Sequence, residues 1–124
     1  MESHGQVAVR VDGGVVRATL TGQIGRQRSA RAIELAAQAA GEAHSELLLF
    51  DVSQARFDDY HTLVLDGVRR VKERGIGHYR IAILGAPGDK RLAYMEDVAA
   101  NRGLRARAFT EERDALEWLH ARAP

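Results

Sequence analysis

Residues 46–65 constrain the fold of this sequence more than any other segment. They open with a nearly continuous apolar run, residues 46–52, which is typical of a central strand covered on both faces. A polar stretch over residues 53–57 then predicts a loop. From Tyr60 to Val71 the apolar side chains recur every three and four residues, which predicts an amphipathic helix that ends at Gly75. The segment therefore predicts one strand and one helix of a largely parallel sheet.

The start of the chain predicts a β-hairpin. Apolar and polar residues alternate over residues 7–11, as in a half-buried strand, and they alternate again over residues 15–21. An Asp-Gly-Gly sequence at residues 12–14 separates the two runs, and glycine accepts the positive φ angles that tight hairpin turns require. We therefore expect an antiparallel pair of strands at the N-terminal end.

The rest of the chain predicts helices that alternate with strands. After a polar loop over residues 22–28, we expect a helix over residues 29–43 whose apolar face is mostly alanine. The later elements are expected as a strand at 79–84, a helix at 89–102, a strand at 105–109 and a helix at 110–122. The order β-β-α-β-α-β-α-β-α predicts a single α/β domain over residues 1–124, with a mixed, mostly parallel sheet.

The composition argues against several classes of protein. In 124 residues, 18 lysines and arginines balance 17 acidic residues, and the net charge of +1 argues against a dedicated nucleic-acid binder. The chain has no cysteine, which excludes disulfides and thiolate chemistry. No apolar run approaches the length of a membrane span, and the N-terminal residues lack the pattern of a signal peptide. We therefore expect a cytoplasmic protein without a membrane span.

No pattern in the sequence points to catalysis, to a metal or to a cofactor. The five histidines lack the spacing of metal ligands, and no serine has a histidine nearby in a known catalytic motif. Residues 85–90 differ from a phosphate-binding loop, because two residues rather than four separate the glycines and Arg91 follows the lysine. We interpret this segment as a turn capped by Asp89. A weak anion site at Gly88, Lys90 and Arg91 is the competing interpretation.

Two sequence motifs resemble those of STAS domains. One is FDVS followed by FDDYHTL, within residues 50–63, and the other is RAFT followed by DALEWL, within residues 107–119. The second motif is similar to the C-terminal end of the SpoIIAA-like branch, and the first is similar to the switch region of anti-sigma-factor antagonists. The predicted order of elements resembles the STAS fold over the whole chain. The resemblance implies a regulatory domain that binds a partner protein and performs no catalysis.

The sequence departs from the antagonists at the residues that control them. In those proteins a serine shortly after an aspartate is phosphorylated by a partner kinase, and this phosphorylation controls binding. Asp59 matches the aspartate, but Tyr60 and His61 stand where the two serines would be, and Thr62 stands at the glycine. The resemblance therefore implies a binding surface without the serine phospho-switch.

Our leading hypothesis is a non-catalytic regulatory or protein-interaction module. The alternative is a domain that binds a small molecule, a lipid or an anion, and the third hypothesis is an enzyme of unknown type. Two of the candidate surface residues have a purely structural interpretation as well: Tyr60 could serve packing, and Ser53 could serve a turn. We also expect Asp58 or Asp59 to cap the helix that follows. An exposed edge strand in the hairpin leads us to expect a homodimer. The predicted interaction surface comprises Ser53, Arg56, Asp58, Asp59, Tyr60 and His61.

Overall fold

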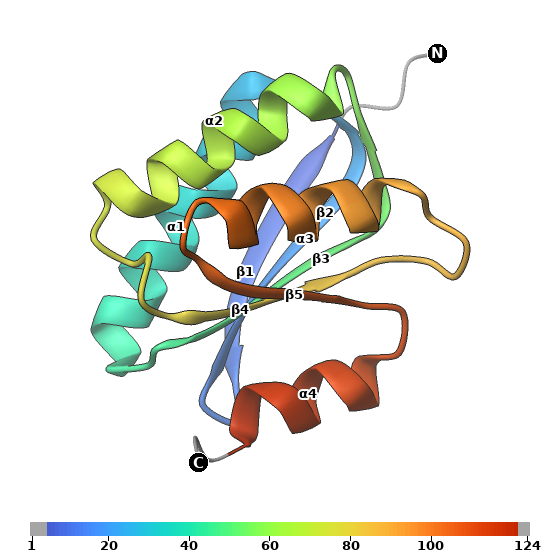
Figure 1. Cartoon of the computed structure of the whole chain (residues 1–124). Coiled ribbons are helices and arrows are strands. Elements are labelled where there is room, and N and C mark those ends of the chain that lie inside the picture. Colours follow the sequence, from blue (N-terminus) through green and yellow to red (C-terminus); the bar gives the residue numbers. More distant parts are fainter. Residues whose placement is uncertain (1–4, 122–124) are drawn as a thin grey trace.

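Five strands form one mixed sheet in the computed structural model, which describes residues 5–121 (Figure 1). The strands lie in the sheet in the same order as in the sequence. β1 and β2 are antiparallel, and each later neighbouring pair is parallel. The predicted α/β class, order of elements and N-terminal hairpin are confirmed. The strands are β1 (Gln6–Asp12), β2 (Val15–Ile24), β3 (Leu47–Phe57), β4 (Arg80–Leu84) and β5 (Arg105–Phe109).

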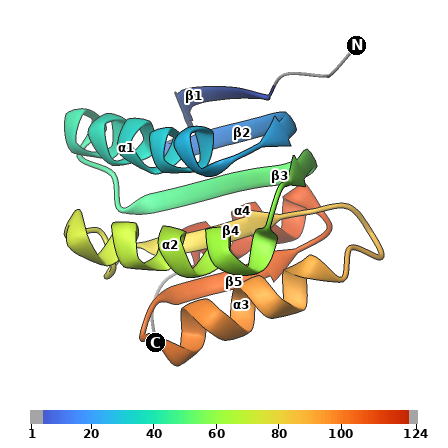
Figure 2. The ribbon, with the colours of Figure 1, turned by 90° about the horizontal axis from the view of Figure 1, so that it is seen from above.

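Helices cover the two faces of the sheet unequally (Figures 1 and 2). Three helices lie on one face, where their apolar residues form the larger core with inward-facing residues of the sheet. The fourth lies on the other face and forms a smaller core, to which it contributes Ala115 and Leu119. The helices are α1 (Arg26–Ala43), α2 (Tyr60–Glu73), α3 (Arg91–Asn101) and α4 (Glu112–His120). α4 is the helix on the second face of the sheet.

The turn between β1 and β2 shows why the hairpin forms where the sequence predicts it. Gly13 and Gly14 have φ angles of 59° and 80°, a region that costs other residues energy and glycine almost none. Asp12 and Val15 therefore pair directly across a two-residue loop. From there β2 directs Val16 and the alternate residues that follow it into the larger core.

β3 is longer than expected, and the loop predicted over residues 53–57 is wrong. The strand continues to Phe57, which pairs with Ile24 at the end of β2. Val52 and Ala55 are buried in the larger core, and Phe57 packs against it. The stretch is polar by composition, but its few apolar residues all face the core, which is sufficient for a half-buried strand.

An irregularity in the pairing of β2 with β3 accompanies this extension. Val52 and Ala55 are three residues apart yet both face the core, and the register shifts between Thr19 and Thr21 of β2. A β-bulge has this effect, because one extra residue reverses the alternation of side chains. The loop predicted over residues 22–28 is also wrong, since β2 runs on to the fully buried Ile24 and α1 begins only two residues later.

Candidate functional site

The carboxyl ends of β2, β3 and β4 lie at one edge of the sheet, because these strands are parallel. α1, α2 and α3 begin at this edge. The strand order never reverses, so the sheet has no switch point of the kind at which open α/β sheets bind ligands. The start of α2 and the turn before α3, which carry most of the predicted site residues, thus lie at the same edge.

Asp59 is the N-cap of α2, one of the two caps that the sequence predicts. Its carboxylate accepts a hydrogen bond from the Thr62 hydroxyl at 2.8 Å and one from the Thr62 backbone N–H at 3.4 Å. The bond from the hydroxyl, followed by that from the backbone, holds the pKa of Asp59 below its ordinary value. The neighbouring Asp58 side chain accepts a hydrogen bond from Gln23 near the end of β2. The two aspartates therefore attach the start of α2 to its own first turn and to β2.

Tyr60 and His61 of α2 lie against Tyr94 of α3, and we call these three residues the aromatic cluster. The ring centroids of Tyr60 and His61 are 4.0 Å apart, and those of His61 and Tyr94 are 4.7 Å apart. Tyr94 meets Tyr60 edge-on at 5.7 Å, and its hydroxyl donates to the His61 carbonyl at 3.5 Å. His61 is exposed and both tyrosines are half-buried, so the aromatic cluster forms part of the surface.

Sequence reasoning missed Tyr94. Nothing in its local pattern distinguishes it from the apolar residues of α3. The topology contains the missing signal, because α2 and α3 begin at the same edge of the sheet and an aromatic residue in the first turn of each can meet its neighbour.

The structure does not bring Ser53 and Arg56 into the aromatic cluster. The Ser53 backbone N–H and hydroxyl both donate to one oxygen of Asp51, at 3.0 and 2.6 Å. Asp51 pairs with Arg17 at 3.3 Å, and Arg17 also pairs with Glu112 of α4, so this group lies on the α4 face of the sheet. Arg56 is exposed and follows Ala55, and strand alternation directs its side chain away from the larger core.

Arg91, a member of the predicted anion site, makes several bonds within the protein. Its guanidinium donates to both oxygens of Asp89 and to the backbone carbonyls of Ala55 at 3.0 Å and Val52 at 3.4 Å. The guanidinium holds the pKa of Asp89 below its ordinary value. Asp89 also accepts from the Arg91 backbone N–H at 2.9 Å, directly before α3, whose N-cap residue is Lys90.

The other two members of that predicted site are arranged differently. Gly88 forms the turn with a φ angle of 83°, and Lys90 is exposed. Anion binding at this turn stays a prediction, and in this geometry it would depend on Lys90 more than on Arg91, whose charge Asp89 already neutralises.

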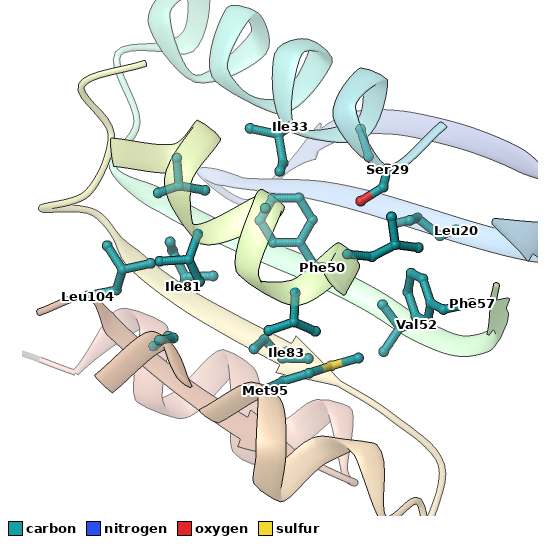
Figure 3. Close-up of a pocket in the computed structure, with 18 residues that line it drawn as sticks. Leu20, Ser29, Ile33, Phe50, Val52, Phe57, Ile81, Ile83, Met95 and Leu104 are labelled. Carbon is teal, nitrogen blue, oxygen red and sulfur yellow. The ribbon is translucent and has the colours of Figure 1, made fainter. Parts of the chain in front are cut away.

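An apolar pocket of about 130 Å³ lies between the sheet and the helices α1, α2 and α3 (Figure 3). Of the described residues that line it, Ser29 alone has a polar side chain. Phe50 of β3 and Ile83 of β4 belong to the interior strands of the sheet, and yet both remain half-buried because they face the pocket. We refer to this space as the apolar pocket.

Small residues leave this volume unfilled. Ala32 of α1, Gly67 of α2, Ala99 of α3 and Ala106 of β5 all line the apolar pocket. Protein interiors are normally packed without voids larger than a water molecule, so a space of this size is uncommon. The α2 backbone approaches α1 and α3 more closely than it approaches the strands. α2 therefore covers the apolar pocket without filling it, a result that the alanine face of α1 suggests only in hindsight.

Residues 5–121 contain neither a grouped set of metal ligands nor a membrane-spanning helix. No group of three or more histidine, aspartate or glutamate side chains in this range is placed to hold a metal ion. No helix within the same part of the chain combines the length and the apolar content needed to cross a bilayer.

No protein-family model matches this chain, and no curated protein matches it. Solved structures do. An uncharacterised DUF3478 protein from Shewanella loihica with a SpoIIAA-like fold is 18% identical, with a TM-score of 0.67 over 96% of this chain and 98% of that one. An anti-sigma factor antagonist from Mycobacterium paratuberculosis is 14% identical, with a TM-score of 0.62 over 98% and 100% of the two chains. The chain has a SpoIIAA-like fold.

SpoIIAA itself, in its unphosphorylated form, matches with a TM-score of 0.57 and 15% identity over 96% of this chain and 100% of its own. At such identities the likeness shows the fold alone, and it confirms the architecture that the sequence motifs imply. Within the SpoIIAA-like fold, Tyr60 and His61 lie in the first turn of α2, at the positions that the motif comparison matches to the serines of the antagonists.

Proposed function

We propose that this SpoIIAA-like domain is a non-catalytic regulatory module that binds a cytoplasmic partner protein through the aromatic cluster. The observation that carries the proposal is the gathering of Tyr60, His61 and Tyr94 on the surface at the start of α2. Aromatic residues, and tyrosine in particular, are enriched at the energetic centres of protein interfaces. The fold likeness to anti-sigma factor antagonists supports a role in regulation.

The construction of the helix start supports a preformed surface. Asp59 caps α2, and the three rings contact one another, so their rotamers are restricted before a partner arrives. A restricted side chain loses less conformational entropy on binding than a mobile one. The surface is therefore suited to binding a partner without rearrangement.

The hydrogen bonds at this helix start also support binding without a phospho-switch. Thr62 is the first serine or threonine after Asp59 in α2, and its hydroxyl donates to the Asp59 carboxylate. Phosphorylation of Thr62 would require this bond to break. We therefore propose that the partner binds the unmodified domain.

The proposal predicts a partner whose capture depends on the aromatic cluster. The tagged domain and a Tyr60→Ala/Tyr94→Ala double variant are exposed to the native cytoplasm, and each protein retained only by the wild type is then purified. Direct titration of that protein is expected to show at least a tenfold loss of affinity for the double variant, since central aromatic residues contribute more than about 1.4 kcal/mol.

Leu65→Ala is the matched control, because Leu65 is a large exposed apolar residue of the same helix outside the aromatic cluster. Its affinity is expected to stay within about twofold of the wild type. A captured partner that binds the double variant as tightly as the wild type would show that the proposed surface is wrong.

A further inference from the structure

The apolar pocket has the composition of a ligand site and lies apart from the aromatic cluster. Figure 3 shows side chains from the strands, among them Phe50, Val52 and Ile83, directed toward the same space as Ile33 of α1 and Met95 of α3. These residues come from four separate elements, so the space is formed by the tertiary fold as a whole. An apolar cavity of this kind holds water poorly, because water finds no hydrogen-bonding partners there.

Gly67 indicates that the space is not a simple consequence of tight packing. It lies in the interior of α2, where glycine is less favourable than alanine. A Cβ atom at this position would meet only the Ile33 Cδ1 atom, at 3.5 Å, which is an ordinary contact. Alanine would therefore fit, stabilise the helix and fill part of the apolar pocket. The glycine instead keeps the space open at a cost in helix stability.

Ser29 contributes one polar group, its hydroxyl, to the lining of the apolar pocket. Its hydroxyl belongs to the only polar side chain among the described lining residues, and Figure 3 shows its oxygen among the apolar side chains. A serine hydroxyl can donate one hydrogen bond and accept others. None of the described lining residues is charged, so an ionised ligand group would lose its hydration without compensation.

We propose that the apolar pocket binds a small apolar molecule with one neutral hydrogen-bonding group, and that this group meets the Ser29 hydroxyl. A cavity of about 150 Å³ accommodates benzene, so a pocket of about 130 Å³ takes a ligand of benzene or phenol size. The ligand lies beneath Leu63, Val64 and Gly67, which belong to the same helix as Tyr60 and His61. This inference goes beyond the proposed function and holds whether or not a protein partner is found.

Phenol, benzene and benzoate added to the purified full chain provide the test. We expect saturable changes in the amide NMR signals of Gly67 and Val68 with phenol and benzene, with dissociation constants on the order of 0.1–1 mM. Phenol is expected to bind about three- to tenfold more tightly than benzene, which corresponds to one net hydrogen bond. Ser29→Ala is expected to remove this difference and to leave the affinity for benzene unchanged. Benzoate, being ionised, is expected not to bind.

Filling the pocket provides the second arm. Gly67→Val is expected to weaken phenol binding at least tenfold, and Val11→Ala, a truncation on β1 outside the pocket, is expected to leave it unchanged. If Gly67→Val fails to fold, Gly67→Ala replaces it, since a methyl group meets no close contact, and a twofold or greater loss is then expected.

Three results would overturn the proposal: no saturable signal change with either neutral probe, equal binding of benzoate and phenol, or unchanged phenol affinity in the folded pocket-filling variant. Equal affinity for phenol and benzene in the wild type would overturn the role given to Ser29. Because none of these measurements involves a protein partner, their outcome is separate from that of the interaction proposed above.

Discussion

Arg91 joins three parts of the chain through one guanidinium group. It pairs with Asp89 in the turn before α3 and donates to two backbone carbonyls of β3, and its charge lies over the Phe57 ring at 5.2 Å from the centroid. The Asp89 and Arg91 side chains are only 11% and 21% exposed. An arginine in this arrangement has a structural role, because each of its bonds fixes the turn against the end of β3.

Replacing Asp89 tests this role. Asp89→Ala removes the bond to the Arg91 backbone N–H and leaves the guanidinium without its carboxylate, and we expect the free energy of unfolding to fall by about 2 kcal/mol. Urea denaturation measures the change. Lys90→Ala, at the exposed neighbouring residue, is the control and is expected to change stability by less than about 0.5 kcal/mol. Similar midpoints for the two variants would show that the Asp89–Arg91 pair contributes nothing.

Which single residues can be predicted from a sequence depends on how local their role is. The capping role of Asp59 follows from its place just before a helix, and Gly75 has the positive φ angle of 76° expected after one. The roles of Tyr94 and Arg91 depend instead on contacts with residues more than thirty positions away. No periodicity carries such information, so the aromatic cluster could be predicted only in part.

α2 carries a group of charged side chains around Asp66. Asp66 pairs with Arg70 at 2.7 Å and with Arg69, and Arg26 of α1 lies at 3.9 Å. The bond to Arg70, supplemented by that to Arg69, holds the pKa of Asp66 below its ordinary value of 3.8. The ionised carboxylate therefore favours the folded helix.

The sign of the resulting pH dependence follows. Because the pKa of Asp66 is lower in the folded state, its contribution to stability is complete above the unfolded value of 3.8 and is lost as pH falls through the lower folded value. We expect the midpoint temperature of thermal unfolding to decrease as the pH is lowered below about 4. Asp66→Asn is expected to lower the midpoint at pH 7 by a few degrees and to flatten the acid limb. An acid limb equally steep in Asp66→Asn would contradict this assignment.

The elements themselves were predictable to different degrees. The helical repeat of α2 correctly identified Leu63, Val68 and Val71 as its buried residues. The end of β3 was not predictable, because a bulge against β2 breaks the alternation that identifies a strand. A two-residue period is a local signal, whereas the pairing partner that makes residues 53–57 a strand lies about thirty residues earlier in the chain.

The outer edge of β1 bears on how copies of the molecule associate. Within residues 5–121, β1 pairs only with β2, and Val11 near its end is 47% exposed. Unpaired strand edges favour association with another chain unless charges protect them, and Arg10 is the central charge of β1. The homodimer expected from the sequence therefore stays a prediction, now with β1 as its interface.

Light scattering after size-exclusion chromatography measures this association. We expect a mass near twice the 13.6 kDa of one chain, and the mass of one chain for Val11→Lys, which places a charge on the edge. Leu65→Lys changes an apolar residue of similar exposure, 39%, on α2, and is expected to leave the dimer intact. A 13.6 kDa species at every concentration of the wild type would exclude the dimer.

The space beneath α2 also determines how the molecule responds to hydrostatic pressure. A folded protein that contains an unfilled cavity occupies more volume than its unfolded chain in water, where solvent occupies that space. Poorly hydrated apolar space within the pocket of about 130 Å³ adds to the volume that the molecule loses on unfolding, on the order of tens of millilitres per mole. We therefore expect the region beneath α2, the helix that carries Tyr60 and His61, to be the most compressible part of the molecule.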